Sequence, residues 1–276
     1  MTIVGAWVRA TKRNVEEVVV CSDSRLSGGG LMDCSPKIFQ LPRSDAVLAF
    51  SGNTQLAYPI LLQMSHAISC HGPMRDGIID IVPLTTYLKR ILNELFHGLR
   101  EVVYDDLKEP DTNFLLCGYS WFKKEFIIER FYFNKSNKCF ETQPSGKGVG
   151  NFGKFRFIGD VRGEATTRLT QLLRQRYGDE SVSKESTLMQ KYNMEPFEVI
   201  RDMLRRSTRV DSIGGAPQIV AVGQHMISKP LGVFWPSMND RKVYVNGRPI
   251  FDFENIDNWI IDPDTLEKYH KQLKAW

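Results

Sequence analysis

The sequence lacks the features that mark secreted, membrane-spanning and metal-stabilised proteins. No charged and then apolar leader opens the 276 residues, and no apolar run approaches the roughly 18 residues that a membrane helix needs. The five cysteines include no C-x-x-C pair and the five histidines show no H-E-x-x-H spacing, which argues against a disulfide framework and a metal site. We therefore expect a soluble, reduced, cytoplasmic protein with no metal and no cofactor.

A strong charge of either sign is also missing. The net charge is +4, and 42% hydrophobic with 25% charged residues is ordinary for a globular protein. Basic residues do not gather with aromatic residues on one element, so a nucleic-acid partner is the least expected one. The basic run 205–209 is more typical of a solvated helix end. The length suits one large domain or two small ones with a sizeable core.

Apolar periodicity predicts strands and helices in separate runs. Strands are expected at 2–9, 15–21, 37–41, 46–50, 114–119, 125–133, 139–142, 155–160, 217–222 and 231–235. Helices are expected at 53–69, 84–99, 164–177 and 196–206. The first four strands, joined by short turns, are expected to form one antiparallel sheet. Such grouped runs argue against a doubly wound fold and favour an α+β class, with two packed antiparallel sheets covered by two helix pairs.

The core is expected to span residues 1–235, with residues 236–276 as a C-terminal extension. The segment Val243–Ile250 is typical of a hairpin that turns at its Asn-Gly pair. Asp262-Pro263 is a good helix start, and three apolar residues follow it at helical spacing. These residues are Leu266, Tyr269 and Leu273. An amphipathic helix here would pack on its own domain or on a neighbouring subunit.

The chemistry of the chain is concentrated in its first fifty-odd residues, beginning with Thr2. Methionine is usually removed before a small residue, so loss of Met1 would make Thr2 the first residue. A threonine hydroxyl needs a base, and a free α-amine has a pKa of about 7.7–8.0, near working pH. Nucleophile and base would then share one residue, and attack on an amide would give an acyl-enzyme that water hydrolyses. Alone, a Met-Thr start more often simply begins an edge strand.

Three further residues have positions from which they can converge on Thr2. Asp23 directly follows an apolar strand, where a carboxylate would hold a lysine or the terminal amine. Lys37 opens the next strand, and a lysine near the hydroxyl would stabilise the developing alkoxide. Gly52 ends an apolar strand before a helix, so its N–H can serve as an oxyanion donor. Each alone has an ordinary explanation as a turn residue, a surface charge or a strand-to-helix turn.

Together these residues resemble the proteasome β-subunit family of N-terminal-nucleophile (Ntn) hydrolases, including the HslV-type and other bacterial proteasome-like peptidases. The matching segments are Thr2–Gly5, Cys21–Arg25 with Gly28–Gly30, Lys37-Ile38, Phe50–Gly52, Ile158–Asp160 and Asp211–Gly215. The resemblance covers residues 2–235. It implies a four-layer αββα sandwich of two antiparallel sheets, which agrees with the element order.

The resemblance also implies a role for each residue of the catalytic group. Thr2 would be nucleophile and base, Asp23 and Lys37 its charged supports, and Gly52 the oxyanion donor. Asp160 stands where the family has a serine, so a carboxylate would bond the terminal amine.

Four more residues take roles from the same resemblance. Asp211 would match the late acid of the family and count among the catalytic residues. Phe50, at the base of the substrate pocket, and Ser51 beside it would contact substrate. Arg25 would be structural.

These roles predict a threonine-type peptidase or amidohydrolase that cleaves peptide or protein substrates. Its relatives enclose their sites in rings, so a homo-oligomer is expected. The chain carries no ATPase motif, so any energy-dependent unfolding would require a separate ATPase. Two alternatives stay open. One is a structural subunit that kept the fold and lost catalysis, and the other is a small-molecule amidase or acylase on the same scaffold.

Overall fold

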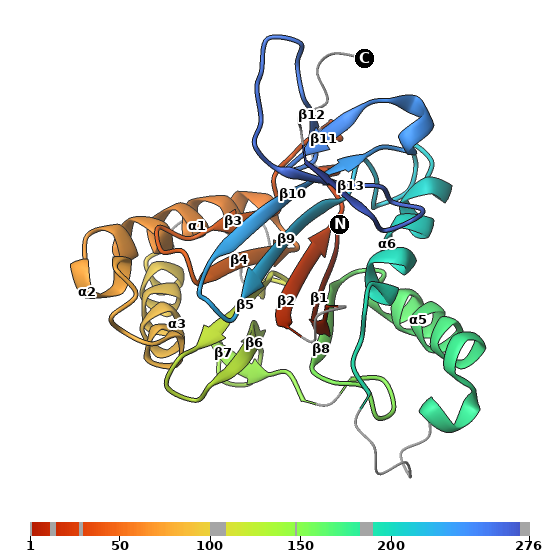
Figure 1. Cartoon of the computed structure of the whole chain (residues 1–276). Helices are drawn as coiled ribbons and strands as arrows, with labels where there is room; N and C mark the ends of the chain where they lie inside the picture. Colours follow the sequence, from red (N-terminus) through yellow and green to blue (C-terminus); the bar gives the residue numbers. More distant parts are fainter. Residues whose placement is uncertain are drawn as a thin grey trace.

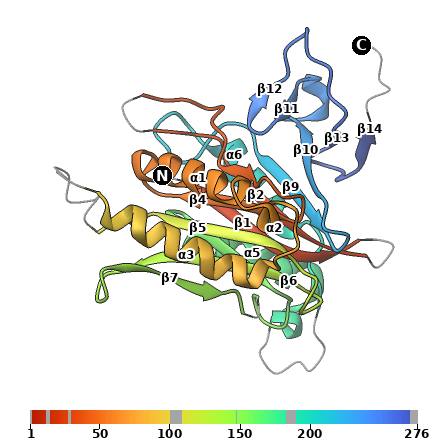
Figure 2. The ribbon, with the colours of Figure 1, turned by 90° about the vertical axis from the view of Figure 1, so that its left-hand side faces the viewer.

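The structure is a computed structural model that describes residues 2–11, 15–27, 30–99, 109–146, 148–182 and 190–270. Within these ranges the fold is mixed α and β, with two β-sheets that face each other and helices on their outer faces (Figures 1 and 2). Met1, the expected loop residues Gly28 and Gly29, and Leu273 lie outside the described residues.

The larger sheet contains nine strands among the described residues, in the order β12-β11-β10-β9-β2-β1-β8, with β13 paired to β10 and β14 paired to β13. Its strands are β1 (Ile3–Ala10), β2 (Glu16–Ser22), β8 (Phe155–Gly159), β9 (Gln218–Gly223), β10 (Ser228–Phe234), β11 (Val243–Val245), β12 (Arg248–Pro249), β13 (Trp259–Ile261) and β14 (Lys268–His270). Neighbouring strands run antiparallel except β10 and β13, which pair in parallel.

The smaller sheet has the order β3-β4-β5-β6-β7 and is antiparallel throughout. Its strands are β3 (Ile38–Gln40), β4 (Ala46–Ser51), β5 (Asn113–Ser120), β6 (Glu125–Asn134) and β7 (Cys139–Pro144). The expectation that the first four strands form one sheet is therefore wrong, because β1 and β2 lie in the larger sheet. Local turns cannot decide this division, since β1, β2 and β4 are each buried on both faces and need a second sheet to cover them.

The helices are α1 (Thr54–Ser69), α2 (Gly72–Arg75), α3 (Ile81–His97), α5 (Arg162–Tyr177) and α6 (Glu195–Arg206), with 3-10 turns η1 (Asp179–Val182) and η2 (Met238–Asp240). The four predicted helices are confirmed with small shifts at their ends. Asn53 caps α1 by accepting from the N–H of Gln55 at 2.8 Å, and Asp80 caps α3 through the N–H of Val82. No helix of the described ranges is long and apolar enough to cross a membrane.

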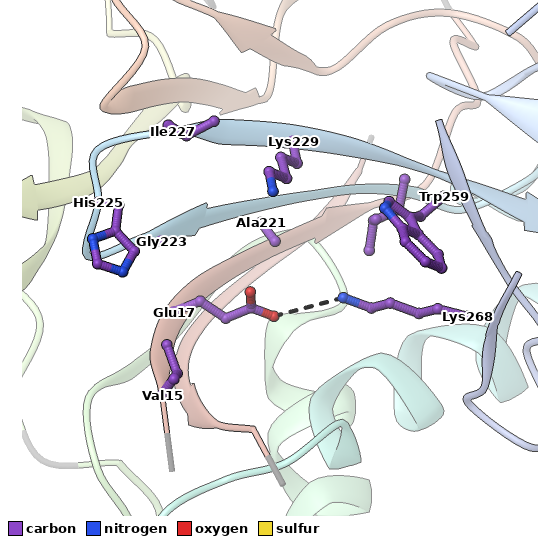
Figure 3. A pocket seen from close by; sticks show the side chains of 10 residues that line it. Val15, Glu17, Ala221, Gly223, His225, Ile227, Lys229, Trp259 and Lys268 are labelled. Atoms are coloured by element: carbon purple, nitrogen blue, oxygen red, sulfur yellow. Dashed lines mark ion pairs between the residues drawn. The ribbon is translucent and has the colours of Figure 1, made fainter. Parts of the chain in front are cut away.

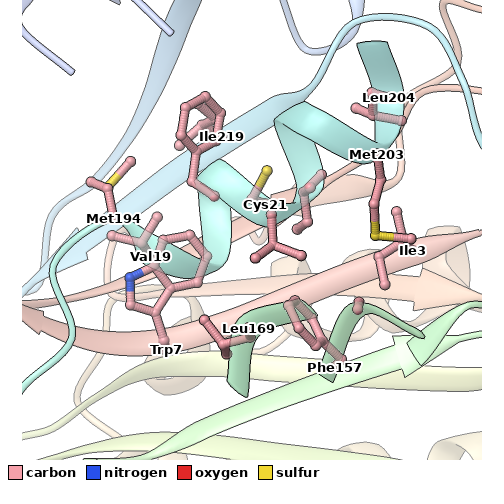
Figure 4. Packing of buried hydrophobic residues seen from close by; sticks show 14 of the residues in the cluster. Ile3, Trp7, Val19, Cys21, Phe157, Leu169, Met194, Met203, Leu204 and Ile219 are labelled. Atoms are coloured by element: carbon pink, nitrogen blue, oxygen red, sulfur yellow. The ribbon is translucent and has the colours of Figure 1, made fainter. Parts of the chain in front are cut away.

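Buried apolar side chains form three layers of core, and β1 contributes to two of them. Val4 and Ala6 face the smaller sheet, where they meet side chains such as Val47 of β4. Ile3 and Trp7 face the opposite way, under α5 and α6. Figure 4 shows this outer layer, with Met203 of α6 beside Ile3. Because alternate residues of β1 are buried on opposite faces, the strand that begins after Thr2 is fixed from both sides.

A third layer joins the smaller sheet to α1 and α3. Phe50 and Phe114 from the strands pack with Met64 of α1 and Leu88 of α3. The helix pairs therefore cover the two outer faces, as Figure 2 makes visible for α3.

The C-terminal hairpin is confirmed, and it extends the larger sheet. Val245 pairs with Arg248, and the turn residues Asn246 and Gly247 have φ values of 50° and 82°. Gly247 is buried, and a Cβ at this position would collide with Cβ of Ser24. The hairpin turn therefore packs directly on the segment that follows β2.

The amphipathic helix expected from Asp262 is wrong for residues 262–270. The Asp262 carboxylate accepts from the N–H of Asp264 at 2.9 Å and from Oγ1 of Thr265 at 3.0 Å, which closes a turn. Leu266 has φ of 62°, and the chain then reverses into β14, which pairs with β13. Tyr269 lies against Phe234. Leu266 and Tyr269 alone do not distinguish a helix from a turn followed by a strand.

Candidate active site

Thr2 lies at the point where β1 begins, and it is 1% exposed. Its Oγ1 accepts a hydrogen bond from Nζ of Lys37 at 2.7 Å. Its main-chain nitrogen donates to Oδ2 of Asp160 at 2.8 Å, and its carbonyl accepts from the N–H of Asp160 at 3.1 Å. Gly159 has φ of +105°, and a Cβ there would collide with the Thr2 carbonyl. The glycine therefore allows β8 to bring Asp160 against Thr2.

Asp23 and Lys37 form a fully buried ion pair with 2.8 Å between Oδ1 and Nζ. The same Oδ1 accepts from the N–H of Ile3 at 3.1 Å. Oδ2 accepts from the N–H groups of Arg25 and Gly214 at 3.2 and 3.3 Å. Burial lowers the pKa of Lys37, and the carboxylates of Asp23 and Asp160 act in the opposite direction. The lysine is thus held between Thr2 and Asp23 in a water-poor setting.

Gln218 fixes the backbone around this pair, although it is not among the site residues expected from the sequence. Its buried side chain accepts from the N–H of Lys37 at 2.9 Å through Oε1. Its Nε2 donates to the carbonyls of Asp23 at 3.1 Å and Ser35 at 2.7 Å. No motif marks this residue. The signal that could have found it is a polar residue opening an otherwise apolar strand.

Gly52 follows β4, and its backbone conformation requires glycine. Its φ is +105°, and a Cβ would lie 2.6 Å from the carbonyl of Asp111. The end of β4 is tied to Lys37, because the N–H of Phe50 donates to the Lys37 carbonyl at 3.2 Å. The Gly52 N–H donates no hydrogen bond to another described residue. It therefore remains available as a donor.

The two residues expected to contact substrate are both buried. Phe50 packs in the core under α1, with its ring 5.2 Å from that of Tyr58. Ser51 is 1% exposed, and its Oγ has no hydrogen-bond partner among the described residues. The structure thus places Phe50 in the core and does not expose either side chain to a substrate.

Arg25 and Asp211 contact each other in a loop, and neither side chain bonds Thr2 among the described contacts. The Arg25 guanidinium pairs with both carboxylate oxygens of Asp33 at 2.6 and 2.8 Å, and it donates to the carbonyl of Asp211 at 3.1 Å. The Asp211 carboxylate is exposed and accepts from the N–H and Oγ1 of Thr208. The structure therefore does not bring this carboxylate to Thr2. The atom of this loop that reaches the site is the Gly214 nitrogen.

A separate pocket of about 320 Å³ lies beside β2, β9 and β10 (Figure 3). Glu17, Trp259 and Lys268 line it, with 3.9 Å between the Lys268 ammonium and the Glu17 carboxylate. None of the predicted site residues lines this pocket. The described ranges contain no cluster of His, Cys, Asp and Glu suited to hold a metal ion.

No protein-family model matches the chain, and no curated protein is significantly similar to it. The geometry around Thr2 is therefore the basis for assigning a function.

Proposed function

We propose that the chain is a threonine-type amide hydrolase whose nucleophile is Oγ1 of Thr2. The observation that carries this proposal is the position of Lys37. Its Nζ lies 2.7 Å from Oγ1 of Thr2 and 2.8 Å from the buried carboxylate of Asp23. Burial of a charged lysine is costly, so a lysine with no functional role would be expected at the surface and not between a hydroxyl and a carboxylate. Activation of the Thr2 hydroxyl would account for the buried position of Lys37.

The proposed reaction begins with removal of Met1, which turns the Thr2 nitrogen from an amide into an α-amine. The amine takes the hydroxyl proton, directly or through one water, while the Lys37 ammonium stabilises the forming alkoxide. Oγ1 then attacks the substrate carbonyl carbon, and the Gly52 N–H donates to the resulting oxyanion. The α-ammonium returns its proton to the leaving amine. Water attacks the ester in a second round and releases the acid.

Asp160 gives this site a feature of its own. Its carboxylate already accepts from the Thr2 nitrogen at 2.8 Å, so it would be the partner of the α-amine. A carboxylate at that distance favours the protonated amine and raises its pKa. The base would therefore act best at alkaline pH.

We further infer that the fold is the four-layer αββα sandwich of the Ntn hydrolases, of the proteasome β-subunit and HslV type. Two facing sheets with helices on both outer faces support this assignment. A homo-oligomeric peptidase acting on peptides, with any ATPase supplied by another protein, follows from it as a proposal.

A non-catalytic subunit is the second candidate, and the burial of Thr2 favours it. Thr2 is only 1% exposed, so its side chain is not accessible to a substrate in this conformation.

The deciding experiment is the intact mass of the purified protein before and after treatment with a peptide epoxyketone or β-lactone probe. Loss of Met1 and a single adduct, absent in Thr2→Ala, are expected. Retained Met1 without an adduct would leave the non-catalytic subunit. Labelling by a small β-lactone alone would favour the small-molecule amidase.

A further inference from the structure

Three arginines lie near one another on β6, on β8 and at the start of α5. They are Arg130 on β6, Arg156 on β8 and Arg162 in the first turn of α5, and we call them the arginine cluster. Arg130 pairs with Leu115 and Arg156 with Ala6. Leu115 and Ala6 both face the core between the sheets. Because paired residues of antiparallel strands share a face, both arginines point into the space between the sheets.

The members of the cluster are linked through common neighbours. Gln143 pairs with Arg130 across β6 and β7, and its Oε1 accepts from Nη1 of Arg156 at 3.0 Å. Arg162 donates to the carbonyl of Gly159, on the same strand as Arg156, at 3.1 Å. Burial lowers the pKa of Arg130, and the charges of Arg156 and Arg162 lower it further. The three positive charges are therefore close enough to repel one another.

Asp111 and Glu129 act on Arg130 and Arg156 from a distance, but no carboxylate of the described ranges bonds the cluster directly. Nε of Arg130 donates to Oδ1 of Asn113 at 2.7 Å, and Nη2 of Arg156 donates to the carbonyl of Pro144 at 2.9 Å. Both acceptors are neutral, and Nε of Arg156 is buried without a partner in the described ranges. No described carboxylate forms an ion pair with any of the three, whereas Arg25 is paired with Asp33.

A half-buried guanidinium group is normally matched by an anion. Arg130 and Arg156 are both half-buried, Arg162 is exposed beside them, and one N–H of Arg156 is unsatisfied, which points to an anion that binds from outside the chain. Guanidinium groups bind carboxylates in a two-pronged geometry, which also gives directional specificity.

The cluster spans the two sides of the proposed site. Arg162 follows Asp160 by two residues, and Asp160 contacts the Thr2 nitrogen. On the other side, Arg130 is bound to Asn113, which pairs with Ser51 across β4 and β5. A substrate held between Thr2 and the turn after Ser51 would therefore run beside the arginines.

We propose that the arginine cluster is a substrate subsite for a carboxylate side chain. Peptides with Glu or Asp near the cleaved bond are then the preferred substrates. The inference rests on the proposed function, because it takes Thr2 as the reacting group. A free peptide chain fits this position better than a folded partner does, since two of the arginines point into the space between the sheets.

The test uses pairs of fluorogenic peptides that differ only by Glu or Gln at each of the four positions before the cleaved bond. Wild type is compared with Arg130→Gln, Arg156→Gln and Arg162→Gln, and with Arg174→Gln as a control. Arg174 is an exposed α5 residue whose ion pair with Asp179 lies at the surface. At one position, wild type should cleave the Glu peptide at least about tenfold better in kcat/KM, and the cluster variants should lose most of that ratio. The ratio is insensitive to a variant that folds poorly, because both peptides meet the same protein.

Binding to Thr2→Ala provides a readout that does not depend on hydrolysis. Fluorescence anisotropy with labelled Glu and Gln peptides should give the same preference, and added salt should weaken it. Failure of wild type to cleave any peptide would sink the proposed function, and the binding ratio would then decide the subsite alone. Equal binding and equal kcat/KM for the Glu and Gln peptides would overturn the subsite. So would cluster variants that change the oligomeric mass and leave the Glu-to-Gln ratio intact, because the arginines would then belong to a subunit contact.

Discussion

Lys37 Nζ donates to Oγ1 of Thr2 at 2.7 Å, so a fully buried ammonium group holds the hydroxyl at the start of the chain. Thr2 directly precedes β1 of the larger sheet, and Lys37 directly precedes β3 of the smaller one. The contact is therefore made across the interface between the sheets. Its integrity depends on the packing of both.

Replacing Lys37 by alanine should remove activity and also destabilise the protein. The carboxylate of Asp23 would stay buried without its cation, which costs about 3–5 kcal/mol. Urea unfolding measures this loss. The double variant Lys37→Ala/Asp23→Ala should regain part of the stability without regaining activity. Equal stability of the single and double variants would contradict a buried, charged Asp23.

Blocking the release of the Thr2 amine should abolish activity without unfolding the chain. A leucine inserted between Met1 and Thr2 keeps the methionine in place, because its removal requires a small second residue. The probe adduct should disappear in this variant, while Thr2→Ser should still form it. Mass spectrometry reads both results, and thermal unfolding checks the fold. An adduct on the leucine variant would exclude the α-amine as the base.

Asp160 should set the acidic limb of the pH profile. Once Met1 is removed, a neighbouring carboxylate would favour the protonated form of the α-amine, and the proposed base works only when deprotonated, so activity should rise with pH. Asp160→Asn keeps an acceptor and removes the charge. The acidic limb of kcat/KM should then move to lower pH by about one unit. A profile that does not move would mean that another group limits the rate.

Replacing Gln218 by alanine should lower the stability of the protein, although no sequence motif marks this residue. Alanine would leave the N–H of Lys37 and the carbonyls of Asp23 and Ser35 without this partner inside the core. We expect a loss of about 3 kcal/mol in the free energy of unfolding. Gln63→Ala, at an exposed position of α1, should stay within about 0.5 kcal/mol of wild type. Similar values for both variants would remove Gln218 from the support of the site.

Residue periodicity was sufficient to locate most elements of this fold. The stripe of α3 and the two-sided apolar run of β2 are local signals that tertiary contacts reinforce. The spacing of Thr2, Asp23 and Lys37 also allowed their convergence to be expected from sequence. The structure brings these three together.

The remainder depended on contacts that no local pattern encodes. Gln218 meets Lys37 across 181 residues. The family resemblance implies a charged Asp211 in the site, but the loop contributes the Gly214 nitrogen instead. Asp262 predicts a helix start from sequence, but an aspartate carboxylate can cap a helix or close a turn, and here it closes a turn.

The hairpin turn at Gly247 packs against Ser24, next to the carboxylate that holds Lys37. The segment after β2 is therefore supported by the C-terminal hairpin. During synthesis the first 37 residues emerge long before residue 247, and domains complete their folding only when all partners are present. A nascent chain thus carries the proposed nucleophile, Thr2, before the residues that pack around it have been made. Completion of the proposed site would therefore be a late step in the folding of each molecule.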